Sequence, residues 1–167
     1  MSKLTALALS IAVLGGIWAF LALGPLSGYV LVWAGFIAWG CYFALGANTQ
    51  ALQKTIVGMI YGAIIAGVAL ALVGANPLGL PGATGPAVYI AVTVFLLVIV
   101  ANVSMLSAVP ANVFGYAATA AYALQTTGAG SPMVMDLTNP VLIVALSTVF
   151  GAVFGMISGK VADTLGK

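Results

Sequence analysis

Charged residues are scarce in this chain of 167 residues, which has four lysines, two aspartates, no arginine and no glutamate. Charged residues make up 4% of the sequence, whereas a soluble globular domain carries about 25%. Because so few charges cannot cover a surface that faces water, most of the surface must face lipid. The sequence therefore predicts an integral membrane protein.

Histidine is also absent, and Cys41 is the single cysteine. Metal clusters, Ser-His-Asp sites and paired carboxylates cannot be assembled from these residues, and one cysteine forms no internal disulfide. We therefore expect neither an enzyme nor a bound metal or cofactor. The four lysines are separated along the chain, so they form no basic patch, and we expect no nucleic-acid partner.

Long apolar runs dominate what remains. A helix needs about 20 mostly apolar residues to cross the roughly 30 Å hydrocarbon layer of a bilayer. Five runs approach this length: residues 4–23, 55–73, 87–106 and 137–158, and the slightly short 29–45. A sixth segment, 109–128, is weaker, because only 111–124 is mostly apolar. A run of 14 residues is more typical of a re-entrant or buried piece than of a lipid-facing span.

The positions of the lysines favour six crossings over five. Lysine gathers on the cytoplasmic side of short loops. With the N-terminus inside and six crossings, Lys3, Lys54, Lys160 and Lys167 all face the cytoplasm, and Asp136 faces outward. We therefore expect both termini in the cytoplasm. The weak segment then crosses as a helix that neighbouring helices, rather than lipid, largely cover.

Two halves of the chain resemble each other. The segment "GMIYGAIIAG" at 58–67 and the segment "GAVFGMISG" at 151–159 both read Gly, two residues, aromatic, Gly, one residue, Ile. A looser match joins "CYFAL" at 41–45 to "AAYAL" at 120–124. Because three spans per half is an odd number, the halves would have opposite orientation in the membrane. We expect one all-α transmembrane domain, 1–167, of two inverted three-helix repeats, about 1–75 and 86–167.

Glycines spaced four residues apart form small-residue faces in both halves. They are Gly58, Gly62, Gly151, Gly155 and Gly159. Such faces let helices approach closely, so packing is their simplest role, and they favour a homo-oligomer. In inverted-repeat proteins the solute site tends to lie where Gly- or Pro-interrupted spans of the two halves meet. Here those are the second and fifth spans, which Pro25 and Pro110 precede.

Polar and aromatic side chains could line a passage through these spans. The candidates are Trp39, Tyr42, Asn48, Asn102, Asn112, Tyr116, Thr119 and Tyr122. They suit a small uncharged polar solute, or a weakly hydrated cation held over aromatic rings. Two structural alternatives stay open. Hydroxyl groups often bond their own helix backbone, and each Asn is a candidate helix cap or interhelical hydrogen bond.

Three functions are compatible with this pattern. The first is a channel or facilitator that passes a small solute across the bilayer. The second is a non-transporting membrane subunit that binds a partner protein or lipid through its glycine faces. The third is a Na⁺-coupled carrier, because carbonyls and hydroxyls bind Na⁺ at broken helices. Proton coupling is disfavoured, since none of the six spans contains an acidic residue or a histidine.

Short motifs add a family resemblance. They are "WAGF" at 33–36, "YFA" at 42–44, Pro110 before "FG" at 114–115, and "VFG" at 153–155. Over most of its length the chain resembles a family of small bacterial inner-membrane proteins catalogued as domain of unknown function 1097. The resemblance implies a location in the bacterial inner membrane and six spans. It implies no particular substrate.

Overall fold

The computed structural model describes residues 1–166, within which the chain forms six α-helices and two short 3-10 turns and no β-strand. The elements are α1 (Lys3–Leu23), α2 (Val32–Ala44), α3 (Thr49–Ala75), α4 (Thr84–Ile99), η1 (Val100–Asn102), η2 (Ser104–Leu106), α5 (Val109–Gln125) and α6 (Pro140–Leu165). The expected all-helical fold is confirmed. Lys167, expected on the cytoplasmic side, lies outside the described residues.

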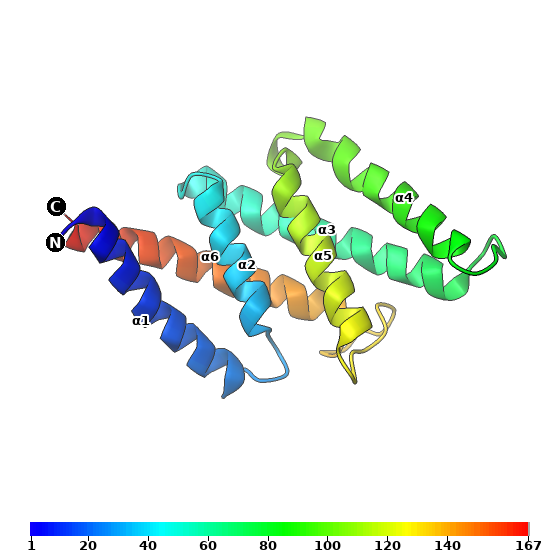
Figure 1. Ribbon diagram of the computed structural model, residues 1–167, viewed down its shortest axis with the longest axis horizontal. Helices are drawn as coiled ribbons and strands as arrows, with labels where there is room; N and C mark the ends of the chain where they lie inside the picture. Colours follow the sequence, from blue (N-terminus) through cyan, green and yellow to red (C-terminus); the bar gives the residue numbers. More distant parts are fainter. Residues whose placement is uncertain (167) are drawn as a thin grey trace.

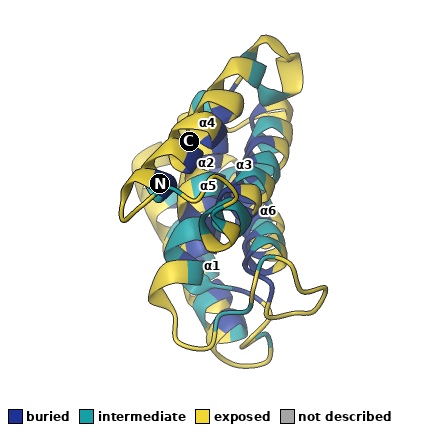
Figure 2. Cartoon of the chain, turned by 90° about the vertical axis from the view of Figure 1, so that its right-hand side faces the viewer, coloured by how far each residue is buried: buried dark blue, intermediate teal, exposed yellow. Residues whose placement is uncertain are grey.

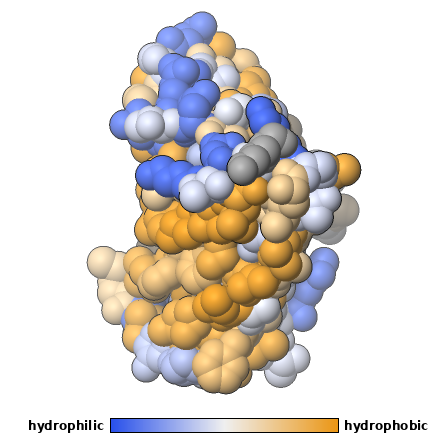
Figure 3. Space-filling view, turned by 90° about the vertical axis from the view of Figure 1, so that its left-hand side faces the viewer, coloured by the Kyte–Doolittle hydropathy of each residue, from blue (hydrophilic) through white to orange (hydrophobic). Residues whose placement is uncertain are grey.

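Four helices are long and apolar enough to cross a membrane. They are Lys3–Leu23, Thr49–Ala75, Thr84–Asn102 and Pro140–Leu165. The other two are shorter, 13 residues for α2 and 17 for α5. Figure 3 shows a broad apolar belt on one face of the molecule, with more hydrophilic residues above and below it. This arrangement is compatible with a membrane protein.

Asparagine caps explain where α3 and α6 begin. The side chain of Asn48 accepts a hydrogen bond from the backbone N–H of Ala51 at 2.8 Å, so α3 starts six residues before the expected span. The side chain of Asn139 accepts from the N–H of Val141 at 2.8 Å, and Pro140 occupies the first turn. The helix α6 therefore begins three residues later than expected, and it continues past Ser158 to Leu165.

The third helix of each half packs mainly against the other half. Helix α6 lies along α1 and α2, whereas α3 lies along α5 and α4, and the two long helices also contact each other (Figure 1). Contacts between α1 and α2 are sparse by comparison. The two halves therefore interlock, and neither forms a separate three-helix bundle.

Glycine allows the closest contacts between helix backbones. A Cβ at Gly115 would overlap the carbonyl oxygen of Met59 on α3, and one at Gly62 would overlap the carbonyl oxygen of Asn112 on α5. A Cβ at Gly151 would overlap the carbonyl oxygen of Gly35 on α2. These glycines let the crossing helices touch through their main chains, which is how small-residue faces work in membrane helices.

The remaining expected packing glycines lie in looser surroundings. A Cβ at Gly58 would lie 2.8 Å from the Asn112 side-chain oxygen, and one at Gly155 would lie 3.0 Å from the Trp39 ring. At Gly159 the nearest atoms to such a Cβ belong to the Phe43 ring at 3.9 Å, an ordinary contact distance. Of these three glycines, Gly58 and Gly155 therefore leave little room for a side chain, and Gly159 leaves more.

Five aromatic rings fill the space between α1, α2 and α6. We call Trp18, Phe36, Trp39, Phe150 and Phe154 the aromatic cluster. Trp18 is fully buried, lies 5.7 Å from Phe154 between ring centres, and donates its indole N–H to the carbonyl of Val32 at 3.0 Å. Trp39 lies 6.1 Å from Phe154. The cluster joins three helices through one continuous set of ring contacts.

The peripheral helix α4 is attached by a single face. Its buried residues are Gly85, Tyr89, Thr93 and Leu97, spaced four apart, and its other faces expose Val, Ile, Phe and Leu side chains. Figure 2 shows this pattern of buried inner faces and exposed outer faces across the molecule. A helix that exposes so many apolar side chains suits lipid as its solvent.

Candidate functional site

A cavity of about 590 Å³ opens at the end of the molecule where the chain termini lie (Figure 1). We call it the terminal cavity. Its walls come from the first turns of α1, the end of α2, the start of α3 and the last three turns of α6. They include Lys3, Leu7, Tyr42, Phe43, Asn48, Thr49, Met156, Gly159, Lys160 and Asp163.

Charge is concentrated in the terminal cavity. Lys3, Lys160 and Asp163 line it, and the whole chain has six charged side chains, four lysines and two aspartates. Among residues 1–166, no lysine nitrogen lies within 4.0 Å of an aspartate oxygen. Half of the charges of an otherwise apolar protein therefore meet in one cavity without forming ion pairs there.

A buried hydrogen-bonded pair lies next to two wall residues of the terminal cavity along the helices. Trp39 is one turn before Tyr42 on α2, and Ser158 directly precedes Gly159 on α6. The indole N–H of Trp39 donates to the hydroxyl of Ser158 at 3.0 Å, and both residues are buried. The Ser158 hydroxyl in turn donates to the carbonyl of Gly155 at 2.7 Å. The hydroxyl of Ser10 on α1 donates to the Ser158 carbonyl at 2.7 Å, so three helices meet at this serine.

The eight residues expected to line a passage lie in different places. Tyr42 and Asn48 line the terminal cavity, whereas Trp39 is buried one turn before Tyr42 on α2 and does not line it. Asn102 is exposed on η1, where its side chain donates to the carbonyl of Ile99 at 3.3 Å. The four candidates on α5 are Asn112, Tyr116, Thr119 and Tyr122. None of them lines the terminal cavity or a second, apolar cavity between α3 and α6. The terminal cavity thus forms between α1, α2, the start of α3 and α6, without α5.

Asn112 connects three segments of the chain. Its side-chain amide, fully buried, donates to the carbonyl of Leu97 on α4 at 3.2 Å and to the carbonyl of Leu106 at 3.0 Å. It therefore holds the end of α4 and the turn after it against α5. This arrangement explains why the expected span 87–106 ends as a helix at Ile99 and continues as 3-10 turns.

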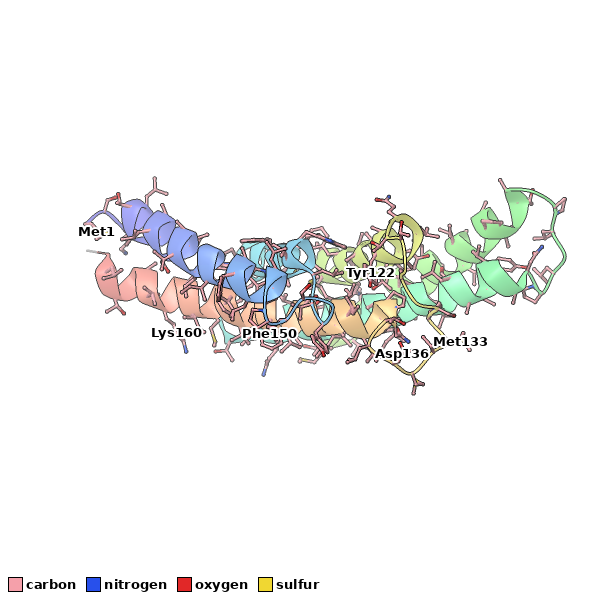
Figure 4. The ribbon with its side chains drawn as sticks, turned by 90° about the horizontal axis from the view of Figure 1, so that it is seen from below. Met1, Tyr122, Met133, Asp136, Phe150 and Lys160 are labelled. Atoms are coloured by element: carbon pink, nitrogen blue, oxygen red, sulfur yellow. The ribbon has the colours of Figure 1, made fainter. Side chains whose placement is uncertain are left out.

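The two tyrosines of α5 differ in their surroundings. The hydroxyl of Tyr116 lies 3.1 Å from the hydroxyl of Thr93 on α4, which also donates to the Tyr89 carbonyl at 2.9 Å. Tyr122 is buried near the other end of α5 (Figure 4). Tyr116 thus acts as a link between α5 and α4.

Thr119→Val is expected to leave the protein as stable as the wild type, or to stabilise it by about 1 kcal/mol. The Thr119 hydroxyl is fully buried and has no hydrogen-bond partner within residues 1–166. An unpaired buried hydroxyl is unfavourable, and valine has nearly the same shape without that group. Thermal unfolding in detergent measures the change. A loss of more than about 1 kcal/mol would mean that this hydroxyl does have a partner, such as bound water or solute.

A second cavity, of about 410 Å³, lies between α3, α6 and the loop before α6. Its walls are mostly apolar, with Ile64, Val68 and Leu142 among them, and no charged residue lines it. The side chain of Asn139 shapes this loop by donating to the carbonyls of Pro132 and Val134 at 3.1 and 2.6 Å. The terminal cavity has charged, amide, hydroxyl and aromatic groups in its walls and is therefore the stronger candidate site.

The loop before α6 also contains Asp136, beside the exposed Met133 (Figure 4). The hydroxyl and the backbone N–H of Thr138 donate to this carboxylate at 2.6 and 2.8 Å. These hydrogen bonds, the hydroxyl first, hold the pKa of Asp136 below its ordinary value. The carboxylate is therefore ionised at neutral pH and marks this loop as a water-exposed end of the molecule.

Long apolar helices around a polar cavity at one end define the class as a multi-helix protein of the membrane type. The chain belongs to the family described as "Protein of unknown function (DUF1097)", whose model matches residues 8–163. The family resemblance of the sequence motifs is thereby confirmed. No curated protein and no solved structure matches the chain.

Proposed function

We propose that this protein is a non-enzymatic facilitator of the bacterial inner membrane that passes a small polar solute, with the terminal cavity as its cytoplasmic mouth. One observation carries the proposal. A cavity of about 590 Å³ with polar, charged and aromatic side chains in its walls lies between the ends of α1, α2 and α6 and the start of α3, in an otherwise apolar helix assembly. Polar surface between apolar membrane helices is costly unless water or solute reaches it, so such a cavity favours a solute path.

Six crossings are part of the proposal. The two termini and the α2–α3 and α4–α5 connections lie along the upper left edge of Figure 1, and the other three connections lie along the lower right edge. Lys3, Lys54 and Lys160 belong to the first edge, and Asp136 belongs to the second. The distribution of lysine makes the first edge cytoplasmic. The short helices α2 and α5 cross because α6 and α3 cover their polar or weakly apolar faces.

Two inverted repeats are also part of the proposal. A half-turn about the viewing axis of Figure 1 brings α1, α2 and α3 approximately onto α4, α5 and α6. The glycine contacts support this relation. Gly58 of α3 lies against Ala111 and Asn112 on α5, and Gly151 of α6 lies against Gly35 on α2. The proposed repeats keep the expected bounds, about 1–75 and 86–167.

In this proposal the solute path follows the group of α1, α2 and α6. It enters by the terminal cavity, passes the Trp39–Ser158 pair, and continues through the aromatic cluster toward the outer side. The rings pack against one another, with Phe36 stacked 5.6 Å from Trp39, so the path is closed in this structure. Transport then requires these side chains to move apart.

Trp39→Ala is expected to raise the flux of urea-sized polar solutes through proteoliposomes at least about tenfold. The substitution removes both the buried ring and the hydrogen-bond donor that stand in the proposed path. Trp33→Ala is the matched control, because Trp33 is on the same helix but is exposed, and its flux should equal that of the wild type. A flux change in Tyr122→Leu without one in Trp39→Ala would locate the path on α5 instead.

A non-transporting subunit is the second candidate function, and the closed packing of the aromatic cluster favours it. Equal and negligible flux of wild type and Trp39→Ala across a broad panel of small solutes would support this alternative. A Na⁺-coupled carrier would instead accumulate solute against its gradient, and the accumulation would collapse without Na⁺. A homo-oligomer is also part of the proposal, because small-residue faces let helices of neighbouring copies approach closely.

A further inference from the structure

We propose that the terminal cavity binds a zwitterion, a small solute with one ammonium and one carboxylate group, such as an α-amino acid with an uncharged side chain. The inference rests on the proposed function only in assuming that the bound solute is the transported one. Binding itself is a separate property of the cavity and can be measured without transport.

The charges of the cavity carry this inference. Lys3 and Lys160 contribute two ammonium groups, and Asp163 contributes one carboxylate. Lys160 and Asp163 are three residues apart on α6, a spacing at which helix side chains commonly pair, yet no lysine nitrogen among residues 1–166 lies within 4.0 Å of an aspartate oxygen. Groups of both signs therefore remain available to a solute in one cavity.

Because the cavity contains both positive and negative side chains, it should distinguish between classes of charged solute. A simple anion would meet the Asp163 carboxylate, and a simple cation would meet two lysines. A zwitterion can give its carboxylate to a lysine and its ammonium to Asp163, so every charge gains a partner. Charged hydrogen bonds of this kind are stronger than neutral ones, and unlike charges at fixed positions orient the solute.

The two lysines are placed differently in the walls of the cavity. Lys3 is at the first turn of α1, and the side chain of Lys160 projects from the flank of α6 that faces away from α1 (Figure 4). Asp163 lies one turn further along α6, toward the end of the helix. Lys3 is therefore the ammonium group better placed to meet a solute together with Asp163, and Lys160 contributes to the wall from the flank of α6.

Uncharged groups of the cavity suit the same ligand. The rings of Tyr42 and Phe43 meet edge to face with centres 5.4 Å apart and form part of the wall, and aromatic faces attract an ammonium group. Asn48 uses its side-chain oxygen to cap α3, which leaves its amide N–H groups as donors for a carboxylate. The volume, about 590 Å³, lies within the range of small-ligand pockets, roughly 300–1,000 Å³.

Isothermal titration of the full-length protein in detergent tests the inference with matched probes. L-alanine carries both charges, L-lactate replaces the ammonium by a hydroxyl, and L-alaninamide replaces the carboxylate by an amide. L-alanine, together with L-threonine and L-leucine as larger zwitterions, covers the size range. We expect at least one zwitterion to bind at least about tenfold more tightly than its anionic and cationic analogues.

Charge-neutralising variants assign the groups. Asp163→Asn should weaken binding of the zwitterion at least about tenfold and leave lactate binding unchanged or tighter. Lys3→Gln should weaken binding of the zwitterion and of lactate together, and Lys160→Gln should have a smaller effect, because its side chain projects away from α1. Lys54→Gln and Asp136→Asn remove charges that lie outside the cavity and are the matched controls, with binding expected to equal that of the wild type.

The outcomes separate this inference from the proposed function. If no probe binds while proteoliposomes still pass uncharged solutes, the zwitterion site is wrong and transport stands. If zwitterions bind with the expected dependence on Asp163 but no flux is found, the site stands and transport is wrong. If lactate binds as tightly as alanine, and Asp163→Asn tightens both, the cavity is an anion site and the inference is overturned.

Discussion

Gly115→Leu is expected to cost at least about 3 kcal/mol of unfolding free energy and to abolish a monodisperse peak on size-exclusion chromatography. At Gly115 even a Cβ would overlap the carbonyl oxygen of Met59, so the leucine has to push α3 and α5 apart. Extra methylenes in a packed core typically cost about 1–3 kcal/mol, and a main-chain neighbour cannot rotate away. Thermal unfolding of the detergent-purified protein measures the loss.

Gly16→Leu is the matched control for that substitution. Gly16 also lies within a helix, but a Cβ at this position would meet no atom of another helix within 4 Å. The control should unfold within a few degrees of the wild type. Similar stability for both variants would mean that α3 and α5 do not touch through their backbones, and the fold described here would be wrong.

Trp18→Ala is expected to lower the free energy of unfolding by about 3–5 kcal/mol. The ring is fully buried between α1, α2 and α6, it stacks 6.1 Å from Phe150, and its N–H satisfies the carbonyl of Val32. The substitution removes the contacts, leaves a cavity and unpairs that carbonyl. In a chain of this size the midpoint of thermal unfolding should fall by roughly 6–20 °C.

Trp33→Ala tests whether burial is the cause. Trp33 is 39% exposed, so its truncation leaves little empty space and should cost less than about 1.5 kcal/mol. Comparable losses for the two variants would contradict the central position of Trp18 in the aromatic cluster. Trp18→Phe should recover part of the lost stability, because it restores a ring without the N–H donor.

Several local features could be predicted from the sequence because they depend on neighbouring residues alone. Six helices appear close to the six expected segments, since each consists of a long apolar or alanine-rich run between turn-forming residues. The predicted boundaries fail at α3 and α6, where asparagine caps act. Asn48 and Asn139 could have indicated both starts, because asparagine is a preferred N-cap residue.

The candidate site was only partly predictable. Tyr42 and Asn48 stood out as polar groups at the end of a span, and both line the terminal cavity. Lys3 and Lys160 were used only to orient the chain, and Asp163 was not among the candidate site residues, although all three line the cavity. Because Lys3 lies at one end of the chain and the other two residues lie at the opposite end, the sequence did not indicate that they share a cavity. Lys3 and Asp163 come together because α6 returns along α1, a contact that no local pattern encodes.

By itself the sequence determined which medium surrounds this protein and which secondary structure it forms. With so few charges only lipid can cover its surface, and in lipid the backbone must satisfy its own hydrogen bonds, which makes helices. Tertiary structure alone decided which helices pair and where a cavity remains. Helix pairing depends on how surfaces far apart in the chain fit together, as Gly115 fits on Met59, and such a fit exists only in three dimensions.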